Sequence, residues 1–142
     1  MQVQSYLMFN GRTEEAIEFY KKALGAQVEM ILRFKDAPEG ECPPALADKV
    51  MHSSFKIGDT VVMASDGMCG GDAQLEFKGI SLTLNPKTEA ECERLFNALA
   101  EGGNIQQPLI ATFFSPKFGV VSDKFGVTWM VLVDQQMASQ AA

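Results

Sequence analysis

The feature that most constrains the fold is an internal repeat in the amino-acid sequence. Gly58-Asp59-Thr60 and Gly126-Val127-Thr128 each open a run rich in β-branched and apolar residues, and the two runs lie about 68 residues apart. A strand pattern that passes directly into an amphipathic helix also recurs, about 75 residues after its first appearance. Repeated spacing of this kind is typical of duplicated structural units. The sequence therefore predicts two modules, each with the order strand, helix and three strands (βαβββ).

In the first module, the turn-forming pair Asn10-Gly11 separates a strand from a helix. Thr13 is placed to cap this helix, and apolar residues follow with the period of one helix face. Gly58-Asp59 predicts the tight turn of a hairpin. The long connection at 36–48 is expected to be either mobile or functional. The expected elements are strands at 3–9, 27–34, 50–57 and 60–65, and a helix that buries Ala16, Phe19, Tyr20, Ala23 and Leu24.

In the second module, Thr88 and Glu91 have the spacing of a capping box, which predicts the start of the second helix. Gly102-Gly103 is expected to end this helix. Trp129 lies in the last strand, which forms one arm of a closing hairpin. The expected elements are strands at 79–85 and 126–133, extended pieces at 105–107 and 111–115, and a helix that buries Cys92, Leu95, Phe96 and Leu99.

The composition predicts a single globular domain, because 46% of the residues are apolar and can form a sizeable core. Its modules are expected at about 1–72 and 73–135, followed by a tail at 136–142. The net charge of −6 and the lack of a basic block argue against nucleic-acid or anionic-membrane partners. No apolar run approaches the roughly 20 residues that span a bilayer, and no basic and apolar leader begins the chain, so we expect a cytoplasmic protein. The three cysteines form no C-x-x-C pair and are expected to be inert thiols.

Five segments of the sequence carry a family resemblance: Ser5–Gly11, Glu15–Tyr20, Met51-His52, Met63–Asp66 and Asp123–Met130. Together they resemble the PhnB-type glyoxalase-like branch of the vicinal-oxygen-chelate superfamily, which includes glyoxalase I, extradiol dioxygenases and the bleomycin and fosfomycin resistance proteins. The resemblance implies an α+β fold in which two βαβββ modules form a cup-shaped mixed β-sheet with helices on its outer face. It also implies a homodimer.

Metalloenzymes of this superfamily bind their ion through side chains from four strands. The resemblance places the four ligand positions on Ser5, on Val62 (or on Met63 or Val61 if the register slips), on Gly79 and on Met130. None of these side chains is a usual ligand for a hard or borderline divalent ion. We therefore expect neither a metal nor another cofactor.

A cup without metal ligands would suit a small, partly apolar molecule, so we expect a metal-independent small-molecule binding protein. The alternative is a filled core that holds no ligand. The expected ligand pocket consists of Ser5, Leu7, Phe9, Val62, Gly79, Ser81, Thr128 and Met130.

His52 is a catalytic candidate, because histidine can transfer protons near neutral pH. The hairpin turn places it opposite Ser65 and places Ser54 opposite Met63, and it would point away from the cup if Val62 points inward. The alternative function is thus a lyase or isomerase that uses His52 or a non-standard metal site.

Two further functional interpretations, a catalytic aspartate pair and a methyltransferase, are not supported by the sequence. Asp66 and Asp123 adjoin strands in turn-like contexts, so we expect them to bond to backbone rather than to form a catalytic pair. Similar sequences carry a ubiquinone-pathway methyltransferase label, which we reject here. An S-adenosylmethionine site normally needs a glycine-rich turn after the first strand of a parallel sheet, whereas Asn10-Gly11 predicts only a hairpin-like turn.

Overall fold

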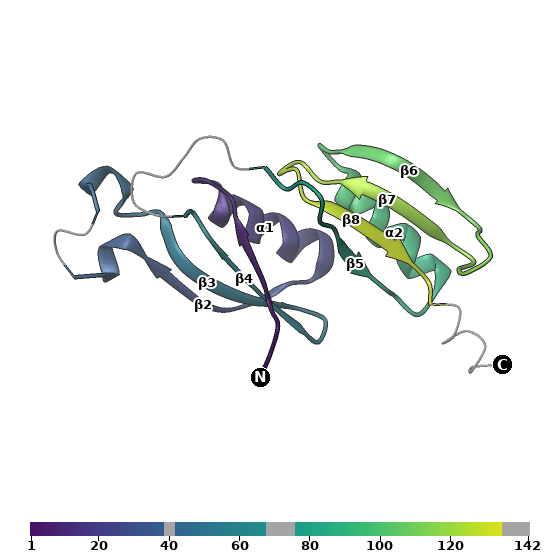
Figure 1. Cartoon of the computed structure of the whole chain (residues 1–142), viewed down its shortest axis with the longest axis horizontal. Coiled ribbons are helices and arrows are strands. Elements are labelled where there is room, and N and C mark those ends of the chain that lie inside the picture. Colours follow the sequence, from purple (N-terminus) through teal and green to yellow (C-terminus); the bar gives the residue numbers. More distant parts are fainter. Residues whose placement is uncertain (39–41, 68–75, 135–142) are drawn as a thin grey trace. The chain divides into compact units, whose positions relative to one another are not determined.

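The computed structural model describes residues 1–38, 42–67 and 76–134, and the chain divides into two compact units, Met1–Leu75 and Glu76–Ala142. Each unit contains one helix and one four-stranded sheet (Figure 1). The strand orders are β1-β4-β3-β2 and β5-β8-β7-β6, so the two sheets have the same topology. This α+β arrangement confirms the predicted duplication of a βαβββ module.

In the first unit, β1 runs parallel to β4, whereas β3 pairs antiparallel with both β4 and β2. The β3–β4 hairpin turns at Gly58-Asp59 as predicted, since Ile57 pairs with Thr60. Two short 3-10 turns occupy part of the connection between β2 and β3, at Phe34–Asp36 and Pro44–Leu46. The main elements are β1 Ser5–Met8, α1 Thr13–Leu24, β2 Gln27–Arg33, β3 Val50–Ile57 and β4 Thr60–Ser65.

In the second unit, β5 runs parallel to β8, and β7 pairs antiparallel with β8 and β6. The strand expected at 79–85 is shorter than predicted, because Gly79 lies in a bend with φ +70° before β5 begins. Residues 111–115 are not extended either, and the preceding strand continues to Ile110 instead. The elements are β5 Leu82–Leu84, α2 Glu89–Ala100, β6 Asn104–Ile110, β7 Phe118–Ser122 and β8 Thr128–Leu132.

The two helices begin in different ways. Thr88 caps α2 as predicted, since its side chain accepts a hydrogen bond from the Glu91 amide at 3.2 Å. The cap expected at Thr13 is wrong, because Arg12 occupies the N-cap position of α1 and makes no side-chain cap bond there. Asp66 at the end of β4 accepts the Thr13 amide instead, at 2.9 Å. A carboxylate from a distant strand thus replaces the local cap.

Each helix buries one face against its own sheet. In the first unit, Tyr20 of α1 packs its ring against Phe9 and Phe55, both with ring centroids 6.2 Å away. In the second unit, Gly119 of β7 lies so close to α2 that an added Cβ would be 2.7 Å from Cε2 of Phe96. The four apolar residues predicted for the buried face of α2 are all buried. These contacts decide which face of each sheet is covered.

The cysteines do not all behave as expected. Cys92 is a buried free thiol on α2, in agreement with the prediction. Cys42 is disulfide-bonded, so the prediction of an inert thiol is wrong for this residue. Cys69 lies outside the described residues. Within the described part of the chain, no helix is both long enough and apolar enough to cross a membrane.

Candidate ligand-binding site

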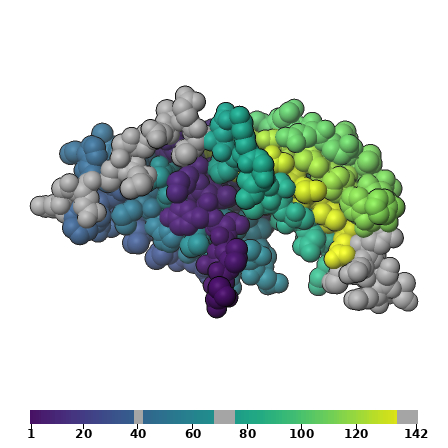
Figure 2. All heavy atoms as spheres, viewed as in Figure 1, coloured from purple at the N-terminus to yellow at the C-terminus, as the bar shows by residue number. Residues whose placement is uncertain are grey.

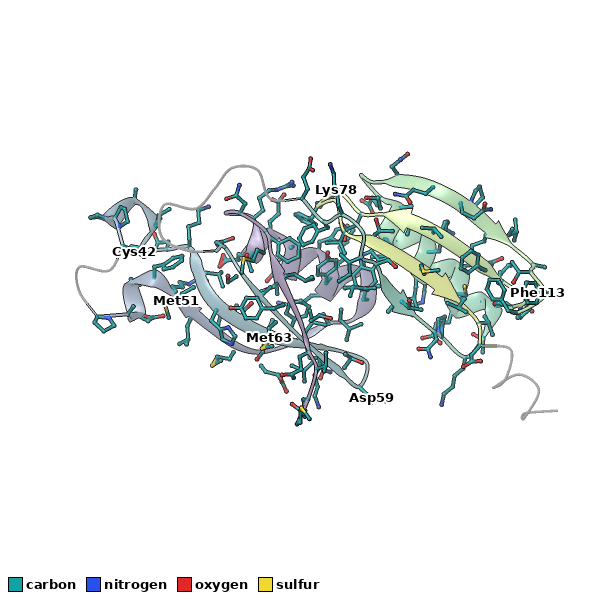
Figure 3. The ribbon with its side chains drawn as sticks, viewed as in Figure 1. Cys42, Met51, Asp59, Met63, Lys78 and Phe113 are labelled. Carbon is teal, nitrogen blue, oxygen red and sulfur yellow. The ribbon has the colours of Figure 1, made fainter. Side chains whose placement is uncertain are left out.

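The face of the first sheet that lies opposite α1 carries a row of side chains across all four strands. Tyr6 of β1 pairs with Met63 of β4, Met63 pairs with Ser54 of β3, and Ser54 pairs with Met30 of β2. Paired residues point to the same side of a sheet, so these four side chains share one face. Figure 3 labels Met63 within this sheet.

A second row lies beside the first. Met8 of β1 pairs with Ser65 of β4, and His52 of β3 pairs with Leu32 of β2. Because side chains alternate along a strand, His52 lies on the same face as Ser54, and Met8 lies on the same face as Tyr6. We call this surface the open face; it consists of Tyr6, Met8, Met30, Leu32, His52, Ser54 and Met63.

The open face has a polar centre formed by Tyr6 and His52. The Tyr6 Oη atom lies 2.8 Å from His52 Nδ1, and the ring centroids are 5.5 Å apart. Tyr6 belongs to β1 and His52 to β3, so the hydrogen bond crosses over β4, which separates the two strands. The bond holds both rings in place above the sheet.

Apolar side chains surround this polar centre and reach solvent. Tyr6, Met8, Met30 and Leu32 are 41%, 40%, 41% and 37% exposed, which is unusual for large apolar residues clustered on one surface. The N-terminal residues, drawn in purple, reach the surface in the space-filling view (Figure 2). Exposed apolar surface around a few fixed polar groups is typical of binding sites.

The residues predicted to line the pocket in the first module lie on the opposite face. Leu7, Phe9 and Val62 are only 7%, 6% and 4% exposed, and Ser5 pairs with Val62. Phe9 contacts Tyr20, so this is the face that α1 covers. Their role in binding stays a prediction, and their burial favours a role in core packing.

The pairing of Ser54 with Met63 is confirmed. His52, which lies on the same side as Met63, therefore points to the open face, while Val62 points toward the helix. The sequence left open whether Val62 or its neighbour Met63 faces the open side of the sheet. In the structure it is Met63. Tyr6 was missed, because Tyr6, Leu7, Met8 and Phe9 are all apolar or aromatic and their alternation gives no sign of which face is covered.

In the second unit, Met130 pairs with Thr83 and Val120, on the face opposite the buried Trp129. Thr128 pairs with Ser122 on that same face. Ser81 directly precedes β5 and is half-buried, and Gly79 lies in the bend before it. The predicted pocket residues of this module are thus spread along one open sheet face and the segment that leads into β5.

The side chains do not fit the divalent metal that the resemblance implies for the superfamily's metalloenzymes. The strand positions on the open faces carry Tyr6 and Met63 in the first unit, and Thr83 and Met130 in the second. Hydroxyl and thioether groups are poor ligands for hard or borderline divalent ions. In the described ranges, no three His, Cys, Asp or Glu residues gather in a way that could hold a metal.

The two aspartates have structural partners. Asp123 accepts hydrogen bonds from the amides of Phe125 and Val127, and from Trp129 Nε1 at 2.9 Å. Asp66 accepts amide hydrogen bonds from Gly11 and other residues outside its own turn. Bonding to backbone was predicted for both, whereas the distant partners of Asp66 were not.

Comparisons with known proteins place the chain in a family. The family model described as 3-demethylubiquinone-9 3-methyltransferase matches residues 1–132. A solved structure from Bacillus cereus that carries the same description and the name PhnB protein is 29% identical, with a TM-score of 0.77; the match covers 94% of this chain and 99% of that chain. The chain belongs to this PhnB-like family.

Other relatives of this PhnB-like chain agree. Protein YjdN of Escherichia coli is 32% identical over 99% of this chain and 100% of its own length. Protein PA1353 of Pseudomonas aeruginosa, a solved structure, is 44% identical with a TM-score of 0.83, over 94% of this chain and 98% of that chain.

More distant structures show the fold alone. The fosfomycin resistance protein FosX of Mesorhizobium loti is 11% identical with a TM-score of 0.64, over 100% of this chain and 98% of that chain. The glyoxalase/bleomycin resistance fold predicted from the resemblance is thereby confirmed.

Proposed function

We propose that this PhnB-like protein is a metal-independent small-molecule binding protein whose ligand lies on the open face of the first unit. The observation that carries the proposal is the hydrogen bond between Tyr6 and His52 at the centre of an exposed apolar surface. This pair offers fixed polar contacts that orient a ligand, while the surrounding side chains offer apolar area.

The proposal is tested by screening a fragment library against the full chain with ¹³C-methyl-labelled methionine. Binding at the open face shifts the methyl signals of Met30 and Met63 and leaves that of Met130 in place. The variant Tyr6→Ala abolishes these shifts. Fragments that perturb only Met130, or whose binding survives Tyr6→Ala unchanged, would contradict the proposed site.

Metal independence needs a separate measurement. Elemental analysis of protein purified without chelators is expected to find no stoichiometric zinc, nickel or iron. Finding one equivalent of any of these metals in the purified protein would count against metal independence. If a chelator then removed both the metal and the fragment binding, this part of the proposal would be refuted.

A second candidate function is a lyase or isomerase in which His52 moves a proton. The contact with Tyr6 supports it, because a hydrogen bond to one imidazole nitrogen fixes the orientation of the other. If any turnover is detected, His52→Ala should abolish it and His52→Gln should retain ligand binding. Unchanged turnover in His52→Ala would remove this role.

The family description names a methyltransferase, and we propose that this chain does not act as one. α1 does follow β1 directly, but the turn at Asn10 and Gly11 that joins them is not glycine-rich. Calorimetry with S-adenosylmethionine is expected to show no binding, and micromolar affinity would overturn this view.

We also propose a homodimer, as the family resemblance implies, and a small molecule as the only partner, with neither nucleic acid nor membrane bound. Light scattering of the purified chain should give twice the monomer mass of 15.5 kDa.

A cytoplasmic location stays a prediction, and the disulfide of Cys42 weighs against it, because disulfides are rare in reducing compartments. Alkylation in rapidly quenched cells tests this point, since a cytoplasmic protein should show Cys42 modified without prior reduction.

A further inference from the structure

We infer that the ligand of the open face is a planar aromatic carboxylic acid that also carries a hydroxyl or similar hydrogen-bonding group. This inference rests on the proposed function, and it specifies the ligand by three features of the same surface. These features are thioether side chains, the spare hydrogen-bonding capacity of the Tyr6–His52 pair, and a lysine on the same face.

The thioethers favour an aromatic ligand. Met63 of β4 and Met30 of β2 pair with Ser54 from its two sides, so thioethers flank β3 on both neighbouring strands. Met63 also pairs with Tyr6, and Met8 lies two residues from Tyr6 along β1. Sulfur–aromatic contacts are favourable, and the flexible thioether adapts to the edge of a flat ring. A planar ring can lie along the rows, where a bulky saturated group would make fewer contacts with sulfur.

The Tyr6–His52 pair keeps one donor and one acceptor for a ligand. If Tyr6 donates to Nδ1 of His52, the imidazole keeps its Nε2–H donor and the phenol keeps an oxygen lone pair. If Nδ1–H donates to Tyr6 instead, the phenol keeps its O–H donor and Nε2 becomes an acceptor. Either arrangement matches a hydroxyl group, which both donates and accepts.

The lysine supplies the charge complementarity. Lys56 pairs with Val61 and Gln27, and alternation along β3 places it on the same side as Ser54 and His52. None of the ion pairs between described residues involves Lys56, which is exposed. An exposed cation at the end of an otherwise uncharged surface favours a carboxylate.

The spacing of these groups sets the size of the ligand. Lys56 lies four residues from His52, which corresponds to about 14 Å along an extended strand. Ser54 and Met63 lie between them. A bicyclic aromatic acid spans this interval when the lysine side chain leans toward the row, with its carboxylate at Lys56 and its hydroxyl at the Tyr6–His52 pair.

The test uses three probes in the methionine-methyl titration of the full chain. 6-Hydroxy-2-naphthoate has the aromatic ring, the hydroxyl group and the carboxylate. 2-Naphthol lacks the carboxylate, and cyclohexanecarboxylate lacks both the aromatic ring and the hydroxyl group. We expect the first probe to bind most tightly and to move the Met30 and Met63 methyl signals upfield through its ring current. Lys56→Gln should weaken the binding of 6-hydroxy-2-naphthoate about threefold to fivefold and leave the binding of 2-naphthol unchanged. Lys22→Gln, an equal charge change on α1, is the matched control and should have no effect.

The outcomes separate this inference from the proposed function. Cyclohexanecarboxylate binding as tightly as the naphthoate would overturn the aromatic class while the binding function stands. Equal binding of the naphthoate to Lys56→Gln and to the unmodified chain would overturn the carboxylate. If neither these probes nor any library fragment shifts the open-face methyl signals, the proposed function fails as well.

Discussion

Thr13 Oγ1 donates a 2.6 Å hydrogen bond to Oδ1 of Asp66, which lies 53 residues later in the chain. The same oxygen accepts the amides of Gly11 and Thr13, and the second oxygen, Oδ2, accepts the amide of Val50 at 2.8 Å. One carboxylate therefore joins the end of β4 to the start of α1 and to the start of β3. This junction ties the start of the helix to the point where β4 ends and β3 begins.

Replacing Asp66 by Asn should lower the free energy of unfolding by about 2–4 kcal/mol, because hydrogen bonds to a buried charged acceptor are strong and the amide cannot accept all four donors. Urea denaturation measures the change. Asp59→Asn in the exposed hairpin turn is the matched control and should shift stability by less than about 0.5 kcal/mol. Equal effects of the two substitutions would show that the junction is not a major source of stability.

Replacing Gly119 by Ala should destabilise the second unit by about 1–3 kcal/mol, because the new methyl group would overlap the Phe96 ring. The same denaturation experiment reports it. The double variant Gly119→Ala/Phe96→Leu removes the closest of the contacts that the methyl group would make, so its loss of stability should be smaller than the sum of the two single losses. Strict additivity would mean that the two residues are not in contact.

Replacing Tyr6 by Phe should alter the environment of His52 without unfolding the protein, because it removes only the hydroxyl group from an exposed ring. The chain has one histidine, so its ¹⁵N signals are unambiguous. We expect the Nδ1 chemical shift to change and the unfolding free energy to change by less than about 0.5 kcal/mol. Ser54→Ala, a substitution on the same face, is the control and should leave Nδ1 unaffected. An Nδ1 signal that does not move in Tyr6→Phe would argue against the hydrogen bond in solution.

Cys92 makes stability depend on pH under alkaline conditions. Burial raises the pKa of its thiol. The nearby charge of Lys117 lowers this pKa, whereas the charges of Glu93 and Glu89 raise it further. An acid with a raised pKa in the folded state stabilises that state fully below its unfolded pKa, which is about 8.5 for cysteine, and this contribution is lost as the pH rises further.

Unfolding free energies measured from pH 7.5 to 9.5 should therefore fall more steeply for the unmodified chain than for Cys92→Ala. The hydrogen-bonded ion pair with Glu93 raises the pKa of Lys117. The upper pH limit of the measurement therefore stays below the pH at which Lys117 titrates. Parallel curves for the two proteins would mean that the thiol is not buried in solution.

The sequence alone determined the features that depend on neighbouring residues. Thr88 caps α2 because its partner amide is three residues away, and Gly58-Asp59 turns the hairpin because short loops allow few conformations. The duplicated order of elements was equally visible, since each module repeats its own local pattern. Cys92, Leu95, Phe96 and Leu99 showed the buried face of α2 by their spacing.

Only the tertiary structure decided which side of the first sheet is open. Tyr6 and Leu7 are both large, as are Val62 and Met63, so alternation along the strands cannot distinguish a covered face from an exposed one. The packing of Tyr20 against Phe9 and Phe55 makes the choice. It buries Leu7, Phe9 and Val62, which the sequence suggested for a pocket. It leaves Tyr6 and His52 on the other side of the sheet. The same long-range packing brings Asp66 to α1, a partner that no local pattern around Thr13 could indicate.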